Sequence, residues 1–310
     1  MTRYASAVFD CDGVLVDVSG SYDAAIRATV DHVLDEAGIP RFEAGPRVIE
    51  AFKQSGGFND EVDLAHAAIL CISAASRAGT DPMRVILEVA GSAGAGGIGA
   101  VAEAAGRVAP IRDVEAVAPH PGPGRRGPLC RIFDQYFYGA GLYEEIYGEA
   151  PRVRTDGLIS RDRLLVDGAL LRGISGALPG GMALVTGRGA ASARRTLGGL
   201  MDIFDLGRSS FLEDGPRELA KPDPRPLLSA VRGLGEPAVY VGDSVEDMVM
   251  AERARDAGAR VDFVGITGAC ADPAARRRIF EGGGAVVLDS VAALPKALNL
   301  EPGARREHGA

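Results

Sequence analysis

The sequence predicts an α/β protein: a parallel sheet covered by helices, interrupted near its start by a helical insertion. Two patterns indicate this fold class. From about residue 160 onward, short apolar runs alternate with stretches of helical periodicity, which is typical of a parallel sheet with helices on both faces. Between residues 19 and 159 the apolar residues follow helical spacing, without strand-like alternation. We therefore expect a core of residues 1–18 plus 160–299, and an inserted helical cap of residues 19–159.

The composition is that of an ordinary soluble globular protein. Its 310 residues suit two domains, and the hydrophobic fraction of 46% and charged fraction of 25% are average for globular proteins. The net charge of −8 disfavours a nucleic-acid or anionic-membrane partner. Apolar runs are too short to span a bilayer, and the first residues do not resemble a signal peptide. We expect no nucleic acid, no membrane and a cytoplasmic location; the sequence leaves the oligomeric state open.

The four cysteines and four histidines are dispersed along the chain. This dispersion fits neither a disulfide framework nor a zinc site, and it is compatible with a reducing compartment. Cys11, between two acids, is expected to act as a small apolar filler at the end of a strand.

The elements follow from periodicity and turn residues. Cap helices are expected at 22–37, 46–52, 61–77, 82–90, 129–139 and 142–147. Core strands are expected at 5–9, 182–186, near Phe211, and at 239–242, 263–266 and 285–288. Core helices are expected at 167–177, 190–199, 226–234, 245–257, 273–280 and 291–298. Residues 91–127, rich in Gly and Pro, are expected to form a flexible segment within the cap, and 300–310 a loose tail.

A glycine run inside the cap formally matches a nucleotide-binding fingerprint. Gly94 to Gly99 satisfy G-x-G-x-x-G. That fingerprint needs a strand before it, so that the glycines bring a helix N-terminus to a pyrophosphate. The preceding residues, from Pro82 to Gly91, carry helix start and stop signals instead. We expect no nucleotide site here.

An acid pair follows the first apolar run. Asp10 and Asp12 lie two residues apart just past the predicted strand end, and Gly13 follows them. Like charges so close raise each other's pKa, and neither is readily buried without a cation or a proton. The pair is therefore either a solvated turn or a metal site in which one carboxylate is a nucleophile and the other a proton donor.

Three further features lie at strand ends or in the loops after them. Thr186 and Gly187 end the second core strand, Lys221 lies in a loop rigidified by proline, and a second acid pair, Asp243 and Asp247, ends a third strand. Ligands of parallel α/β sheets bind beyond the carboxyl ends of the strands. We therefore expect these side chains to meet at one edge of the sheet.

With these four motifs in this order, the chain resembles the haloacid dehalogenase (HAD) superfamily, in particular the cap-bearing branch that includes phosphoglycolate phosphatases and β-phosphoglucomutases. The resemblance implies the HAD fold, a Rossmann-like parallel sheet with a helical cap. It also implies a Mg²⁺-dependent phosphatase that hydrolyses a small phosphorylated metabolite, a phosphate monoester, through an aspartyl-phosphate intermediate.

The resemblance assigns a role to each motif residue. Asp10 is implied as the nucleophile and Asp12 as the proton donor and acceptor. Thr186, the Gly187 amide and Lys221 are implied to bind phosphoryl oxygens. Mg²⁺ suits a site of hard oxygens: the Asp10 carboxylate, the Asp12 carbonyl and Asp243, with Asp247 as a ligand or as an anchor behind one.

The same fold carries other activities, which the motif residues favour or disfavour to different degrees. A phosphomutase keeps every core residue and remains the alternative. A phosphonate hydrolase or a haloacid dehalogenase is less expected, because those enzymes lack the second acid, here Asp12. A non-catalytic binding protein would tolerate the loss of a motif residue, and none is lost.

A polar Gly-rich stretch between two cap helices, residues 53–60, is a candidate substrate-specificity loop. Lys53 and Asn59 are its candidate contacts to the part of the substrate that does not react. The alternative interpretation is an ordinary exposed loop.

Overall fold

A computed structural model of the chain describes residues 4–55, 58, 60–111, 127–270 and 272–300. The chain divides into two compact units: Met1–Val18 with Asp162–Ala310, called here the core unit, and Ser19–Arg161, called the cap unit. The chain leaves the core unit after Val18 and returns to it at Asp162, whereas the sequence pattern placed the return at residue 160.

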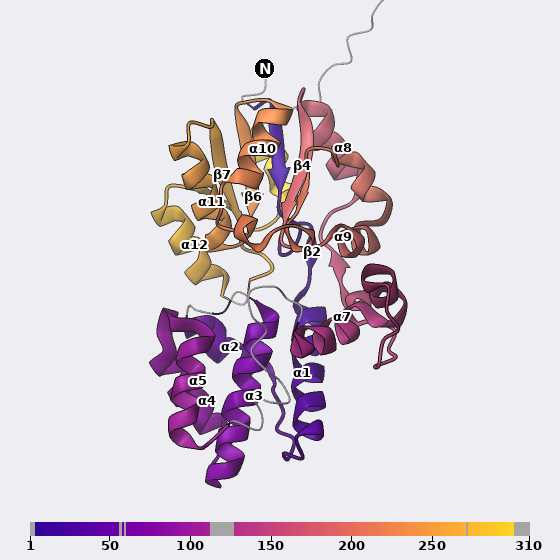
Figure 1. Cartoon of the computed structure of the whole chain (residues 1–310). Helices are drawn as coiled ribbons and strands as arrows, with labels where there is room; N and C mark the ends of the chain where they lie inside the picture. Colours follow the sequence, from indigo (N-terminus) through magenta and orange to yellow (C-terminus); the bar gives the residue numbers. More distant parts are fainter. Residues whose placement is uncertain (1–3, 56–57, 59, 112–126, 271, 301–310) are drawn as a thin grey trace, which may run out of the picture. The chain divides into compact units, whose positions relative to one another are not determined.

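The core unit contains a six-stranded parallel sheet in the order β5-β4-β1-β6-β7-β8 (Figure 1). In the central strands, Phe9 pairs with Leu184 on one side and Val241 on the other. The strands are β1 (Ser6–Phe9), β4 (Gly181–Thr186), β5 (Ser210–Phe211), β6 (Ala238–Gly242), β7 (Val261–Ile266) and β8 (Val286–Leu288). β1 and β6 are buried along their whole length, which explains why they are continuous apolar runs rather than alternating ones. The expected α/β fold with a parallel sheet is confirmed.

Helices cover both faces of this sheet. They are α8 (Gly168–Ala177), α9 (Ala190–Leu197), α10 (Arg225–Leu234), α11 (Val245–Asp256), α12 (Pro273–Gly282) and α13 (Leu294–Ala297). Successive strand residues point to opposite faces, so Phe9 packs into the cluster that contains Leu171 of α8, whereas Val8 packs into the cluster that contains Leu227 of α10. The apolar runs of the strands therefore contribute to two hydrophobic layers, one on each face.

A short antiparallel pair, β2 (Val16–Asp17) with β3 (Arg163–Leu164), joins the two connections between the units. Asp17 and Arg163 also form an ion pair at 2.5 Å. Two-residue strands carry too little alternation to be recognised in a sequence, and we did not predict this pair.

The described residues of the cap unit form helices joined by loops, without a strand among them. Its α-helices are α1 (Ser19–Glu36), α2 (Pro46–Ser55), α3 (Glu61–Ala78), α4 (Pro82–Ala93), α5 (Gly97–Val108) and α7 (Pro128–Tyr147). Helix α3 is buried without interruption from Leu64 to Ala75, as expected for a helix segment that is apolar on all sides. Its ends are set locally: the Asp60 side chain accepts hydrogen bonds from two backbone amides of the first turn, and Gly79 ends the helix in the left-handed conformation.

The prediction of a flexible segment at residues 91–127 is wrong for part of that range. Residues Gly97–Val108 form helix α5, which packs against α3 and α4 and buries Val101, Ala104 and Ala105. Glycine lowers the helix propensity of this stretch, but its small apolar residues at helical spacing allow close packing against neighbouring helices, and this packing stabilises the helix. Residues 112–126 lie outside the described part of the chain. The Gly94 to Gly99 run follows helix α4 rather than a strand, as expected.

Two boundaries also differ from those expected. Helix α7 is one run with a kink at Gly139, whose φ of 75° interrupts the helical geometry. A Cβ there would lie 2.4 Å from the backbone nitrogen of Gly157, so the close crossing of the two chain segments requires glycine. Leu300, placed in the loose tail by the sequence, is buried in the core unit, and residues 301–310 lie outside the description. None of the described helices is both long enough and apolar enough to cross a bilayer.

Candidate active site

The motif residues lie at the carboxyl ends of three neighbouring strands. Asp10 directly follows β1, Thr186 is the last residue of β4, and Asp243 directly follows β6. Because β1 lies between β4 and β6, the three positions share one edge of the sheet. This is the edge at which parallel α/β sheets bind ligands.

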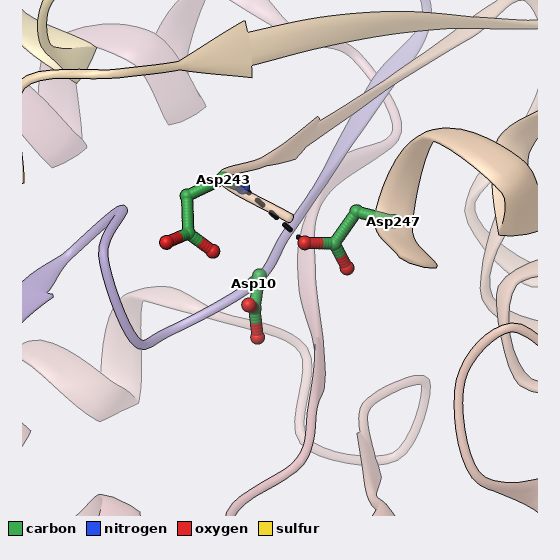
Figure 2. A group of neighbouring side chains, drawn as sticks. All are labelled: Asp10, Asp243 and Asp247. Atoms are coloured by element: carbon green, nitrogen blue, oxygen red, sulfur yellow. Dashed lines mark hydrogen bonds between the residues drawn. The ribbon is translucent and has the colours of Figure 1, made fainter. Parts of the chain in front are cut away.

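Three carboxylates from this edge form a cluster. Oxygens of Asp10, Asp243 and Asp247 all lie within 4.8 Å of one another. Figure 2 shows Asp10 between Asp243, at the end of its strand, and Asp247, on the first turn of α11. Asp10 and Asp247 are buried and Asp243 is half-buried, so the mutual repulsion of the three is weakly screened by water.

Lys221 neutralises part of this charge. Its Nζ lies 2.8 Å from Oδ1 of Asp10 and 2.7 Å from Oδ1 of Asp247. The lysine side chain is only 10% exposed, so it is not a solvated surface lysine. With every group ionised, three carboxylates and one ammonium leave a net charge of −2.

Burial and crowding shift the protonation of the cluster. Burial, together with the charges of Asp247 and Asp12, raises the pKa of Asp10 to about 7, against the opposing charge of Lys221. Burial, together with the charges of Asp10 and Asp247, also raises the pKa of Asp243 well above its ordinary value. Without a cation, the site therefore retains protons near neutral pH.

Asp247 differs from the other two acids because hydrogen-bond donors surround it. Besides Lys221, its Oδ1 accepts from the Tyr240 hydroxyl at 2.6 Å. Its Oδ2 accepts from the amides of Asp243 and Ser244 and from the Ser244 hydroxyl at 2.7 Å. Burial alone would raise the pKa of Asp247, but the Lys221 ammonium and these hydroxyl donors outweigh it and lower the pKa. Asp247 is thereby held as an ionised anchor for Lys221.

Asp12 lies outside the three-carboxylate cluster and bonds to a different cation. Its Oδ1 accepts from Nε of Arg188, the second residue after Thr186. The Arg188 side chain is 1% exposed, whereas that of Asp12 is 27% exposed. The carboxylate is therefore fixed from the protein interior and remains open to solvent.

The predicted phosphate-binding residues are in contrasting environments. Thr186 is fully buried, and its Oγ1 accepts from the backbone amide of Arg188 at 3.2 Å. Gly187 is exposed at the carboxyl end of β4. Lys221, as described, lies against Asp10. The structure thus gathers Asp10, Lys221, Asp243 and Asp247 in one cluster, while Asp12 and Thr186 each contact Arg188.

The candidate specificity loop of the cap is partly corrected. Lys53 is exposed, but it belongs to the last turn of helix α2 rather than to a loop. The helix runs three residues beyond the expected end at Phe52 because Ser55 bonds back to the Phe52 carbonyl at 2.7 Å. Asn59 lies outside the described residues.

Four residues of the site had no predicted role. Ser244 was recognisable, because Ser followed three residues later by an acid is the pattern of a capping box, and that box starts α11. Tyr240 looked like one more strand residue. Arg188 lies between β4 and α9 and looked like an ordinary polar residue of the connecting turn. Asp162, which bonds Arg188 at 2.7 Å, carries no local signal at all.

The chain has relatives among proteins of known structure. The chain is similar to the solved structure of phosphatase Tt82 from Thermococcus thioreducens, with 28% identity, 89% of this chain and 99% of that chain covered, and a TM-score of 0.60. A predicted phosphoglycolate phosphatase from Haemophilus somnus 129PT is 17% identical, with 96% of this chain and 99% of that chain covered and a TM-score of 0.52. At that identity the likeness concerns the fold.

A curated protein matches over a shorter stretch. Over 105 residues, 32% of this chain, the sequence is 37% identical to imidazoleglycerol-phosphate dehydratase of Phytophthora nicotianae. The match covers 22% of that protein, so this chain spans about a fifth of the length of that relative.

The sequence model of the haloacid dehalogenase-like hydrolases matches residues 4–255. The matched region contains the whole site, from Asp10 to Asp247, and the inserted cap. The chain belongs to the haloacid dehalogenase-like hydrolase family.

Proposed function

We propose that the protein is a Mg²⁺-dependent phosphatase that hydrolyses a small phosphorylated metabolite through an aspartyl-phosphate intermediate. The observation that carries the proposal is the placement of Asp10. This carboxylate, at the ligand-binding edge of the sheet, lies 2.8 Å from the Lys221 ammonium and within a cluster of oxygen ligands whose net charge is −2 when every group is ionised. A divalent cation and the oxygens of a phosphoryl group complement such a site.

The metal proposal follows from the donors that meet there. Asp10 and Asp243 offer carboxylate oxygens, and the Asp12 carbonyl is a third hard ligand of the kind that Mg²⁺ prefers. Asp247 is better placed as an anchor than as a ligand, because donors already surround both of its oxygens. When bound, the ion offsets the charge of the cluster and of the phosphoryl group.

The reaction is proposed in two balanced steps. An oxygen of Asp10 attacks phosphorus, the bond from phosphorus to the leaving oxygen breaks, and Asp12 gives that oxygen a proton. Water then attacks the aspartyl-phosphate, Asp12 takes a proton from the water, and the bond between Asp10 and phosphorus breaks. Inorganic phosphate is released and both side chains return to their starting state.

The remaining motif residues bind the phosphoryl group in this proposal. Lys221, held against Asp10 by Asp247, supplies a fixed positive charge to the phosphoryl oxygens. Thr186 and the exposed Gly187 lie at the end of the neighbouring strand and supply hydrogen-bond donors. This arrangement favours transfer from phosphorus over attack on carbon, which needs neither the second acid nor a metal.

Two of the similar proteins support the substrate class. The structure named a phosphatase is 28% identical over nearly all of its length, which supports hydrolysis over phosphomutase activity. The other relative is named for imidazoleglycerol phosphate, itself a phosphate monoester. An alcohol phosphate bearing an imidazole ring therefore belongs among the substrates to test.

A substrate panel tests the proposal. Phosphate release is measured from p-nitrophenyl phosphate, sugar phosphates, phosphoglycolate, nucleotides, amino-alcohol phosphates and an imidazole-bearing alcohol phosphate, with Mg²⁺ or with EDTA. We expect Mg²⁺-dependent release from the generic ester and a much higher kcat/KM for one member. Turnover unaffected by EDTA would refute the metal proposal. Phosphoryl transfer between positions of a sugar without net phosphate release would identify a phosphomutase.

A further inference from the structure

Arg188 is the most deeply buried guanidinium in the neighbourhood of the proposed active site. Its side chain is 1% exposed, and a buried charge is costly unless it is paired and hydrogen-bonded. Three nitrogens of this side chain bond to three different residues: Nε to Oδ1 of Asp12, Nη1 to the Thr196 hydroxyl at 2.9 Å, and Nη2 to Oδ2 of Asp162 at 2.7 Å.

Asp162 and Thr196 brace one another as well as the arginine. The Thr196 hydroxyl, on helix α9, donates to Oδ2 of Asp162 at 2.9 Å. Asp162 is the first residue of the core unit after the cap insertion. Its side chain is only 2% exposed. The guanidinium, the hydroxyl and the carboxylate thus form a closed triangle inside the protein. This triangle leaves Arg188 little freedom to reorient.

We propose that Arg188 is a positioning residue for the reaction: it fixes the Asp12 carboxylate in the orientation from which Asp12 exchanges protons with the leaving group and with water, and Asp162 and Thr196 fix Arg188. The inference rests on the proposed function. It assigns a task to three residues that lie outside the proposed metal, nucleophile and phosphate-binding set.

The geometry requires arginine rather than any cation. The planar guanidinium directs donors along several fixed directions, so it reaches Asp12 on one side while Asp162 and Thr196 hold the other. A lysine at this position retains the charge, but its compact ammonium cannot hold all three contacts in these directions. Substitution by lysine therefore separates orientation from charge.

The proposal predicts an unequal effect on the two chemical steps. p-Nitrophenolate is a stable anion that leaves without a proton, whereas a simple alkoxide needs one. A misplaced Asp12 therefore slows aspartyl-phosphate formation from an alkyl phosphate but not from p-nitrophenyl phosphate. Hydrolysis of the aspartyl-phosphate needs Asp12 as a base whichever ester formed it.

The experiment compares Arg188→Lys with the unaltered protein in rapid-mixing and steady-state assays with Mg²⁺. For p-nitrophenyl phosphate we expect a burst of p-nitrophenolate within about threefold of the normal rate, followed by turnover slowed about 100-fold. For an alkyl phosphate, phosphoenzyme formation itself should slow by a similar factor. Asp12→Ala should show the same pattern in a stronger form. Arg194→Lys, on helix α9 and with its side chain 58% exposed, is the matched control and should leave all rates unchanged.

Equal losses in the burst and in turnover, or equal losses with both esters, would overturn the positioning role and indicate a merely structural arginine. Thermal unfolding shows whether Arg188→Lys folds. If it does not fold, Thr196→Val is measured instead, because this substitution removes one hydrogen bond to Arg188 at nearly constant side-chain volume. We expect a smaller loss of turnover with the burst of p-nitrophenolate again spared. An equal loss in the burst and in turnover would overturn the proposal. An unaltered protein without turnover would overturn the proposed function, and this inference with it.

Discussion

Gly13 lies directly against Asp243. A Cβ at Gly13 would fall 2.0 Å from Oδ2 of Asp243, and the φ of +70° at Gly13 belongs to the left-handed region that glycine favours. The turn after the first acid pair therefore packs its bare backbone onto the acid at the end of β6. This contact brings the Asp10 loop and Asp243 close enough to share a cation.

Gly13→Ala should inactivate the enzyme by displacing Asp243. Gly38→Ala is a matched control, since Gly38 has a φ of +64° but no atom within 4 Å of a built Cβ. Both substitutions should cost about 1–2 kcal/mol of unfolding free energy through backbone strain. Only Gly13→Ala should lower kcat, by more than about 100-fold, and raise the Mg²⁺ concentration needed for activity. Similar kinetics for the two variants would show that the contact does not shape the site.

The stability of the metal-free protein should fall as pH rises from about 5 to 8. Burial raises the pKa of Asp10 to about 7 and that of Asp243 well above its usual value, so the folded state binds protons more tightly than the unfolded chain. Their contribution is present at low pH and is lost as pH rises through these values. Asp247, whose pKa is lowered, acts in the opposite sense only in more acidic solution. Thermal unfolding in EDTA at several pH values measures the slope.

Mg²⁺ should raise Tm more at the higher pH, because the ion competes with the protons retained by Asp10 and Asp243. Asp243→Asn should flatten both dependences by removing one of the two carboxylates. An increase in Tm that is the same across the pH range would contradict the assignment of these acids to the metal site.

Asp10→Asn should abolish turnover while making the metal-free protein more stable at about pH 8. The amide has nearly the same shape, but it cannot attack phosphorus and does not repel Asp243. Lys221 keeps its contact with Asp247 at 2.7 Å, so no ammonium is left unpaired. A gain of about 1 kcal/mol or more is expected by denaturant unfolding in EDTA. Asp202→Asn, at a position 74% exposed, should change neither quantity. Near-normal rates in Asp10→Asn would exclude Asp10 as the nucleophile.

Lys53→Ala tests the candidate specificity residue of the cap. If Lys53 contacts the part of the substrate that does not react, the substitution should raise KM for the preferred substrate about tenfold and change KM for p-nitrophenyl phosphate little. A lower kcat for the preferred substrate is also consistent, since remote contacts contribute to closure. Lys296→Ala, at an exposed position of the core unit, is the charge-matched control. Equal effects on both substrates, or none on either, would place specificity elsewhere in the cap.

Much of the site could be predicted from the sequence because the relevant signals are local. Asp10, Thr186 and Asp243 each follow or end a short apolar run, and parallel strands place such ends on one edge of a sheet. Helix starts were equally local, since Asp167 and Asp272 each accept a hydrogen bond from an amide of the turn that follows. The helix at Gly97–Val108 was missed because glycine masks helix propensity, and packing against α3 decided it.

The sequence by itself thus determined the kinds of chemical groups at the site and the edge of the sheet at which they gather. Only the tertiary structure decided which charges pair: Lys221 with both Asp10 and Asp247, and Arg188 with Asp12 and Asp162. Arg188 and Asp12 are 176 residues apart, and no local pattern connects them. The physical reason is that the energy of a charge pair, and the pKa of each member, depend on distance and burial, which the fold sets and sequence separation does not encode.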